Sequence, residues 1–262
     1  LDALAARGVR FETAVVHVPL TGPSHASILT GLGPLGHGFR ENAGFVLPAH
    51  VKSGAEDFRQ AGYRTAAFVS AFPLDRRFGF DRGFDVYDDH LPKGHDSRRT
   101  PYVERFADGT TDAVLRWLEA PPGPPGPPFF LWVHYYDPHA PYEPPGELAA
   151  RFRTAPYDGE VAFADQQLGR LLHALDERGL LAQTLVLAMS DHGEGLGEHG
   201  EGTHGLFVYD STLKVPFIVA GPGIDTPRVA PTVARGLDVL PTLLDYAGLP
   251  LRPDLEGRSL RP

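Results

Sequence analysis

The chain has 262 residues, of which 42% are hydrophobic and 22% charged, and its formal net charge is −9. These values are typical of an ordinary globular protein with a sizeable core, and the negative charge argues against binding to a nucleic-acid backbone. The chain has no cysteine, which excludes disulfides, thiolate metal sites and cysteine nucleophiles, and it has no run of about 18 apolar residues that could span a membrane.

Helical and strand-like patterns alternate along the chain. Leu1–Phe11 is typical of the end of an amphipathic helix that enters a strand. Four short apolar runs predict buried parallel strands at residues 65–70, 129–134, 185–190 and 216–220. Helical spacing of apolar residues follows at 108–119, 161–178 and 239–246. This alternation predicts an α/β fold in which a mostly parallel sheet is sandwiched between helices, and no clear domain boundary interrupts it.

Polar clusters follow two of the predicted strands. His134, Asp137 and His139 lie at and after the end of the run at 129–134, and Asp191 and His192 come directly after the run at 185–190. Ligands of such sheets gather at the carboxyl ends of the strands. We therefore expect these side chains to meet on one rim of the sheet.

The second cluster belongs to a segment rich in glycine, carboxylates and histidine, Asp191–Gly200. An adjacent aspartate and histidine at a strand end can place two ligand atoms on one metal ion, and the glycines allow the tight turn that follows. The alternative is a solvated acidic loop with an exposed histidine. The density of ligand-type residues favours the metal site.

The segment around Thr21 has the composition of a helix start. Pro23 and Ser24 open an apolar run, so Thr21 is predicted to lie just before a helix. Free backbone N–H groups and the helix dipole favour an anion such as phosphate or sulfate there, and would help a metal-bound hydroxyl to ionise. The alternative is that Thr21 is a simple N-cap, which is a common position for threonine.

Together these segments resemble the sulfatase family. Its signature of a nucleophile, any residue, Pro-Ser-Arg and a short helix ending in Thr-Gly is similar to Thr21–Gly31, and its second metal-binding stretch is similar to Asp191–Gly200. Further similar motifs follow in family order at residues 137–142, 157–165, 214–217, 221–223, 238–244 and 257–260. The resemblance covers nearly the whole chain, and several ordered motifs are more specific than any one of them.

The resemblance implies an alkaline-phosphatase-like fold and a single catalytic domain over residues 1–262. It implies a divalent metal (Ca, Mg, Mn or Zn) and a covalent intermediate on the nucleophile. The metal ligands that it implies are Asp191, His192 and Thr21, with Asp137 as a further candidate. The implied catalytic residues are Thr21, His139 and His204, and the substrate-binding candidates are His25 and Asn42. A second metal on Asp137, His139 and His204 is an open alternative.

The family's first strand, which carries one or two aspartate ligands, has no counterpart here. In the family this strand lies just ahead of a segment that resembles Leu1–Ala5. We therefore expect the chain to be an N-terminally truncated catalytic domain.

Three departures from the family bear on the substrate. Thr21 cannot become the formylglycine of classical sulfatases because its β-carbon carries a methyl group, His25 replaces an arginine, and His204 replaces a lysine. A threonine nucleophile with an Asp-His metal pair resembles the phosphodiesterases and lipid-headgroup phosphotransferases of the same superfamily. We expect a hydrolase or transferase for sulfate or phosphate esters. The alternatives are a phosphodiesterase, a phosphoethanolamine-type transferase, or a non-catalytic binding module.

The expected partner is a small-molecule, lipid or glycan ester and not a nucleic acid. Membrane contact is expected only through segments outside this sequence. The compartment is not fixed by the residues, and a periplasmic or membrane-anchored full-length protein is compatible with them.

Overall fold

A computed structural model gives the fold and describes residues 1–91, 104–119 and 126–261. Its helices are α1 (Asp2–Ala5), α2 (Thr21–Thr30), α3 (Pro34–His37), α4 (Gly54–Gln60), α5 (Ala107–Glu119), α6 (Glu147–Arg151), α7 (Pro156–Glu177), α8 (Asp210–Leu213) and α9 (Val239–Tyr246). Its strands are β1 (Val9–Phe11), β2 (Ala14–Val15), β3 (Arg64–Phe68), β4 (Val86–Asp88), β5 (Phe129–Val133), β6 (Val186–Met189), β7 (Phe217–Ala220), β8 (Arg228–Ala230) and β9 (Ala234–Arg235).

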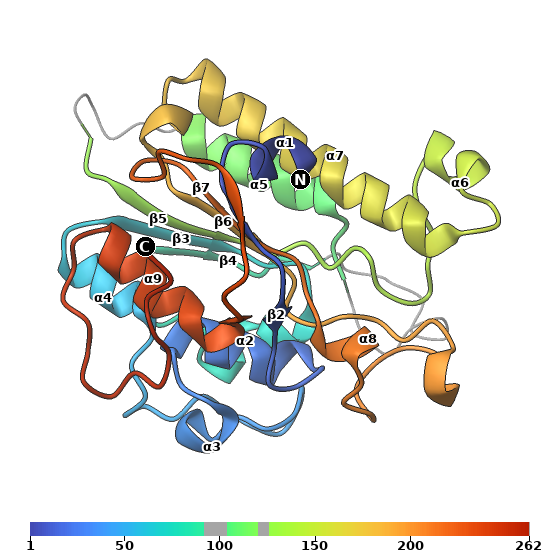
Figure 1. The fold of residues 1–262 in the computed structure, drawn as a ribbon, viewed down its shortest axis with the longest axis horizontal. Coiled ribbons are helices and arrows are strands. Elements are labelled where there is room, and N and C mark those ends of the chain that lie inside the picture. The colour runs from blue at the N-terminus through green and yellow to red at the C-terminus, as the bar shows by residue number, and fades with distance from the viewer. Residues whose placement is uncertain (92–103, 120–125, 262) are drawn as a thin grey trace.

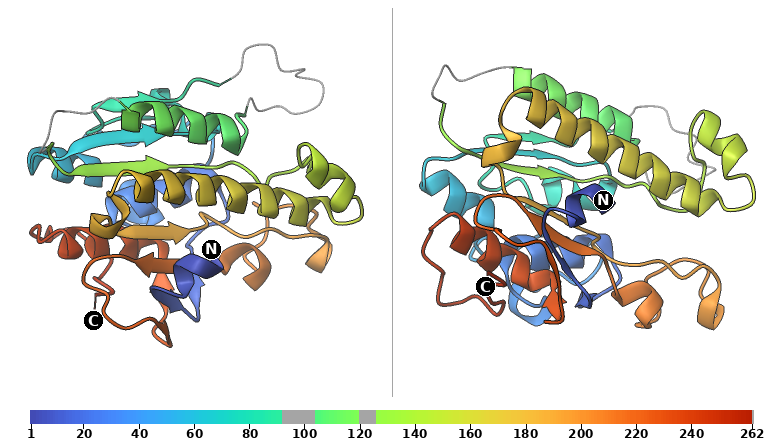
Figure 2. Two further views of the ribbon diagram at one scale, coloured as in Figure 1. Left: turned by 90° about the horizontal axis from the view of Figure 1, so that it is seen from above. Right: turned by 45° about the horizontal axis from the view of Figure 1, so that its top comes forward.

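The strands form a layer with helices on both faces, as the sequence predicts. Helices α5 and α7 lie side by side on one face, and α2, α4 and α9 lie on the other (Figures 1 and 2). Strand β3 shows how the sequence builds this arrangement, because successive side chains of a strand point to opposite faces. Phe68 packs with the α5 and α7 residues, whereas Ala67 packs with those of α2 and α4.

The strands pair in three groups, ordered β4-β3-β5, β6-β7-β1-β8 and β2-β9. The pairs β3–β4, β3–β5, β1–β8 and β2–β9 are parallel, which agrees with the prediction of a mostly parallel sheet. Strand β7 is the exception, because it runs antiparallel to both β6 and β1. Apolar character alone predicts a buried strand but does not give its direction.

Strands β5 and β6 differ from the prediction of fully buried strands. Every residue of both is only half-buried, whereas all four residues of β7 are buried. The reason is their position, since β5 ends one sheet and β6 ends another, and in the described part of the chain no further strand pairs with either edge (Figure 2). Each edge leaves one row of backbone N–H and C=O groups without a strand partner.

The predicted helices agree well with the observed ones. The helix expected at 239–246 is α9 with the same bounds, and that at 108–119 is α5 with one residue more. The helix expected at 161–178 begins earlier, at Pro156, because proline suits the first helical turn, where its missing N–H is not needed. Among the described residues, no helix is both long and apolar enough to cross a membrane.

Candidate active site

Thr21 is the first residue of helix α2, and its side chain is only 2% exposed. The N-cap residue is Leu20, which makes no side-chain capping bond, so the interpretation of Thr21 as a simple N-cap is wrong. Its Oγ1 lies 3.4 Å from Nε2 of His192, a residue 171 positions later. The structure thus brings the predicted nucleophile to one of the predicted metal ligands.

The first turn of α2 has fewer free N–H groups than the sequence suggests. The Gly22 N–H donates to Oδ1 of Asn42 at 2.8 Å, Pro23 has no N–H, and the Ser24 N–H donates to the Leu20 carbonyl at 3.0 Å. The expectation that backbone donors of this turn would hold an anion is therefore largely wrong. Asn42 instead anchors the start of the helix next to Thr21, and its predicted contact with substrate stays a prediction.

Asp191 and His192 follow β6, at the strand end where the sequence places them. The Nδ1–H of His192 donates to the Gly193 carbonyl at 2.9 Å, which leaves the lone pair of the ring on Nε2. That Nε2 lies 3.5 Å from Oδ2 of Asp191. Gly193 is required in this turn, because a Cβ there would meet the Ser211 carbonyl oxygen at 2.1 Å.

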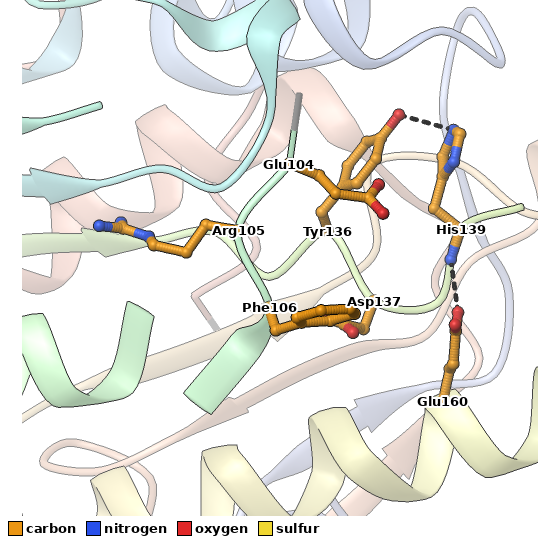
Figure 3. Close-up of a pocket in the computed structure, with 7 residues that line it drawn as sticks. All are labelled: Glu104, Arg105, Phe106, Tyr136, Asp137, His139 and Glu160. Carbon is orange, nitrogen blue, oxygen red and sulfur yellow. Dashed lines mark hydrogen bonds between the residues drawn. The ribbon is translucent and has the colours of Figure 1, made fainter. Parts of the chain in front are cut away.

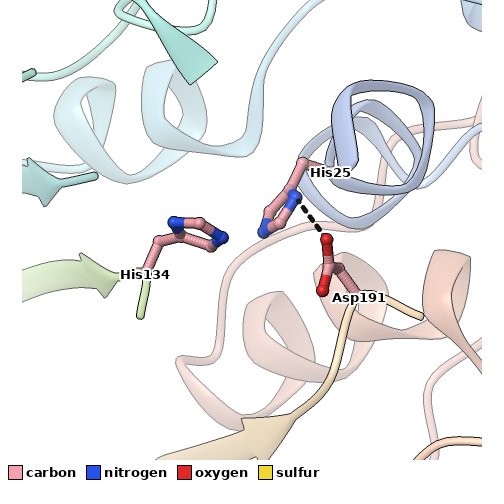
Figure 4. A group of neighbouring side chains, drawn as sticks. All are labelled: His25, His134 and Asp191. Carbon is pink, nitrogen blue, oxygen red and sulfur yellow. Dashed lines mark ion pairs between the residues drawn. The ribbon is translucent and has the colours of Figure 1, made fainter. Parts of the chain in front are cut away.

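Two further histidines surround Asp191 (Figure 4). His25 lies one turn after Thr21 on α2; its Nδ1–H donates to the Thr21 carbonyl at 2.8 Å and lies 3.5 Å from Oδ2 of Asp191. His134, at the carboxyl end of β5, meets His25 edge to face with ring centroids 4.9 Å apart. Both rings are buried. His25 therefore faces Asp191 and His134, and its predicted contact with substrate stays a prediction.

Burial and charge act in opposite directions on these groups. Burial lowers the pKa of His25 and lowers that of His134 to about 3, so both imidazoles are neutral near pH 7. Burial alone would raise the pKa of Asp191, but His192, His25 and His134 outweigh it and hold that pKa well below its usual range. The result is an ionised carboxylate among imidazoles that have lone pairs to offer.

His204 and His139 add two more histidine rings next to His192. The His204 ring lies 4.0 Å from the His192 ring and 5.2 Å from the His139 ring. Nδ1 of His204 is 3.1 Å from Oε1 of Glu194, and both side chains are nearly buried. The Nδ1–H of His139 donates to the Ala140 carbonyl at 2.8 Å, and its Nε2 lies 2.8 Å from the hydroxyl of Tyr136. The two predicted catalytic histidines thus lie together, with His204 beside the predicted metal ligand His192.

A pocket that His139 lines also contains three carboxylates, Glu104, Asp137 and Glu160 (Figure 3). Glu160, on α7, accepts the backbone N–H groups of His139 at 2.9 Å and Glu143 at 2.6 Å. Asp137 accepts the Ala107 N–H at 2.9 Å, at the start of α5. Burial, followed by mutual repulsion, raises the pKa of Glu104 to about 7, and burial likewise raises the pKa of Glu160 to about 7 and that of Asp137 to about 6.

The predicted role of Asp137 as a metal ligand is not supported by this position. Asp137 serves the start of α5, and it does not join His139 and His204, or Asp191, in a ligand group within the described residues. In that part of the chain, one group of three or more histidines and carboxylates has ligand atoms all within 4.8 Å of one another, namely His25, His134 and Asp191.

The comparison with protein families decides what this arrangement belongs to. The family model described as Sulfatase matches residues 1–249. The chain belongs to the sulfatase family. It is 26% identical to an arylsulfatase of Clostridium perfringens over 100% of the chain and 72% of that protein. It is 29% identical to an ulvan-active sulfatase of Formosa agariphila over 99% of the chain and 58% of that protein.

Solved structures agree on the fold of this family member. One, bound to its substrate D-glucosamine-2-N,6-O-disulfate, has a TM-score of 0.81 at 22% identity, over 100% of this chain and 74% of the other. The phosphonate monoester hydrolase of Silicibacter pomeroyi has a TM-score of 0.74 at 24% identity, over 100% of this chain and 70% of the other. The predicted alkaline-phosphatase-like fold is thereby confirmed.

The side chains of this sulfatase domain fit a divalent cation. Thr21, Asp191 and His192 offer a hydroxyl oxygen, a carboxylate oxygen and an imidazole nitrogen, a donor set that divalent cations accept. The free lone pair on His192 and the ionised state of Asp191 satisfy the requirement that ligands be deprotonated. The close approach of the three ligand groups agrees with the metal prediction.

Sequence reasoning missed several contacts of the site. It placed His134 on the same rim as Asp191 but gave it no role, and its contact with His25 appears only in the structure. Glu160 carries no such signal, because it faces the His139 loop only through the packing of α7. The pairing of Glu194 with His204 spans ten residues of an irregular loop, which no periodicity predicts.

Proposed function

We propose that this chain is a metal-dependent hydrolase or transferase of sulfate or phosphate esters in which Thr21 forms a covalent intermediate. The main observation for this proposal is the position of the buried Thr21 hydroxyl at the start of α2. Its Oγ1 lies 3.4 Å from Nε2 of His192, the nitrogen that has the lone pair. A simple structural threonine would be expected to bond a backbone group, as Thr30 at the other end of the helix bonds the Ala26 carbonyl.

Thr21, Asp191 and His192 would hold the divalent cation. When bound, it would lower the pKa of the Thr21 hydroxyl and neutralise charge on the ester oxygens. The Thr21 oxygen then attacks the sulfur or phosphorus atom, a bond forms to it, and the bond to the alcohol oxygen breaks. Water, or an acceptor alcohol, releases the group from Thr21 in a second step.

The leaving alcohol needs a proton, for which His204 is the proposed donor. Burial lowers the pKa of His139 to about 4, so this ring is neutral near pH 7 and is proposed to position the transferred group instead. The His204 ring lies beside His192, and the His139 ring lies beside His204. His204 is oriented by Glu194 through Nδ1, and His139 is fixed through the Ala140 carbonyl and the loop that Glu160 holds. Fixed rings of this kind can protonate a leaving group or steady the oxygens of the transferred group.

The substrate is proposed to be a small-molecule or glycan ester. The named relatives support this, since they include an ulvan-active sulfatase and a hexuronate-2-O-sulfatase. Phosphate esters are also proposed as substrates, because Thr21 cannot form the formylglycine aldehyde on which classical sulfatases depend. A phosphonate monoester hydrolase with the same fold supports keeping both kinds of ester.

The test uses the full-length protein with bound metal and a panel of aryl sulfate, phosphate monoester, phosphate diester and phosphonate monoester substrates. Intact-protein mass spectrometry after rapid acid quench should find one added sulfuryl or phosphoryl group, and peptide mapping should place it on Thr21. Thr21→Ala should lose the adduct and the turnover. Thr30→Ala removes another buried threonine of α2 and is the matched control. If Thr21→Ala kept normal turnover of every substrate, the assignment of Thr21 as the nucleophile would be wrong. A wild-type protein that is inactive on all four substrate classes would favour the alternative of a non-catalytic binding module.

A further inference from the structure

Asp191 contacts two histidines. Its Oδ2 lies 3.5 Å from Nε2 of His192 and 3.5 Å from Nδ1 of His25. His134 stands behind His25, and Figure 4 shows the two rings turning nitrogen atoms toward one another. One ligand atom from each of His25, His134 and Asp191 lies within 4.8 Å of the other two.

Neither histidine uses both of its nitrogens. His25 donates Nδ1–H to the Thr21 carbonyl, which leaves a lone pair on Nε2. Nδ1 of His134 is 3.4 Å from the Ser70 N–H, a long contact, and no hydrogen bond reaches its Nε2 from the described residues. Both imidazoles therefore have a nitrogen lone pair that a cation could accept.

Asp191 has no strong cation beside it. Its ion pairs within the described ranges are with His25 and His192, and neither an arginine nor a lysine is among them. Trp132 packs on the His25 ring at 5.3 Å, so an apolar side chain closes this side of the cluster. A half-buried carboxylate with only histidine partners is stabilised by a bound metal ion.

We propose that His25, His134 and Asp191 bind a second divalent cation of the zinc class, and that the Asp191 carboxylate is shared between this position and the one formed with Thr21 and His192. Two imidazole nitrogens and one carboxylate oxygen form a set that zinc accepts, with positions left over for water or an ester oxygen. The site does not require Thr21 to be a nucleophile.

The experiment counts metal ions per chain in the full-length protein, with Zn²⁺ alone as the probe. After chelation, reloading and dialysis, plasma mass spectrometry should find two equivalents in the wild type. His134→Gln and His25→Gln should each reduce the count to one, and Asp191→Asn should reduce it to zero. His173→Gln removes an exposed histidine of α7 and should keep two. Circular dichroism checks that each variant is folded.

A second measurement protects the test against a variant that fails to fold. Titration of the metal-free wild type with Co²⁺, followed by visible absorption, should have two breaks, at one and at two equivalents. One equivalent in the wild type would overturn the proposal, as would two equivalents in both folded histidine variants. A wild type that binds two cations while Thr21 carries no adduct would instead overturn the proposed function and leave the second site standing.

Discussion

Two polar regions share one rim of the sheet and have opposite compositions. The histidine region has three histidines and one carboxylate, namely His25, His134, His192 and Asp191. The carboxylate region has three carboxylates and one histidine, namely Glu104, Asp137, Glu160 and His139. Burial raises the pKa of a carboxylate in both, yet in the first the imidazoles reverse the effect, and in the second neighbouring carboxylates add to it.

Burial of a carboxylate therefore has a different role in each region. In the histidine region an ionised carboxylate and free imidazole lone pairs provide what a cation needs. In the carboxylate region the oxygens are occupied by backbone N–H groups, so that Glu160 holds a loop and Asp137 holds the start of a helix. The first region thus offers ligands for a cation, and the second fixes the loop that carries His139.

The largest effect should come from removing the single carboxylate of the histidine region. Asp191→Asn keeps the shape of the side chain but removes its charge. We expect loss of bound metal and a fall in kcat/KM of about 10³-fold or more. Steady-state kinetics with an aryl sulfate or aryl phosphate, together with metal analysis, checks this. Retention of metal and activity by the variant would mean that Asp191 is not a ligand.

The next effect tests the turn behind His192. A Cβ in Gly193→Ala would meet the Ser211 carbonyl at 2.1 Å, so the turn must move and His192 with it. We expect a loss of metal affinity of about 10- to 100-fold and a destabilisation of about 1–3 kcal/mol. Calorimetric titration and thermal unfolding measure the two. Gly169→Ala, a helical glycine of α7 with open space around it, is the control: it should leave metal affinity unchanged and stabilise the fold by about 0.5–1 kcal/mol.

A smaller effect should follow a change in the carboxylate region. Glu160→Gln loses one of the two oxygens that accept the N–H groups of His139 and Glu143, because the NH₂ group that replaces this oxygen cannot accept a hydrogen bond. We expect kcat to fall about tenfold through misplacement of His139, with KM little changed and metal content unaffected. Glu177→Gln, at the exposed end of the same helix, should behave as wild type. Loss of metal from Glu160→Gln would mean that the two regions are not independent.

The smallest effect concerns the pH dependence of stability. The pKa of Glu160, about 7, lies above its ordinary 4.5, and the groups that face it are Glu104, Asp137 and Glu143. A raised pKa means that the folded state holds the proton more tightly, so this contribution is complete below about pH 4.5 and is lost as pH rises toward 7. Urea unfolding should therefore give a wild-type free energy that falls by roughly 2 kcal/mol more over this window than that of Glu160→Gln. Equal slopes would contradict the assignment.

Much of the fold follows from sequence patterns. The helices α5 and α9 and the strands β3, β5, β6 and β7 lie where apolar spacing places them, within a few residues. The direction of β7 does not follow, because an apolar run looks the same in both directions. The half-buried state of β5 and β6 depends on sheet order, which local sequence does not encode.

The residues of the site also fall into those that the sequence locates and those that it does not. Thr21 lies at a helix start, and Asp191 and His192 lie at a strand end, which a pattern can locate. His139 and His204 lie in loops, and only the motifs shared with the family point to them. His134 and Glu160 enter through packing between segments more than 20 residues apart, so their roles appear only when the elements are placed in space. Asp137 has a carboxylate in a motif that resembles the family's, which predicts a metal ligand. Only the structure shows that this carboxylate accepts the Ala107 N–H at the start of α5.

The pairing of β1 has a consequence for how this chain is made. Val9 and Arg10 pair with β7 and β8, which lie more than 200 residues later. At a synthesis rate of about 5–20 residues per second, β1 waits roughly 10–40 s on the ribosome before its partners exist. Its apolar residues must be shielded during that time, so we expect the nascent chain to be an early client of ribosome-associated chaperones, and refolding from denaturant to be slow because its central contacts are so distant in sequence.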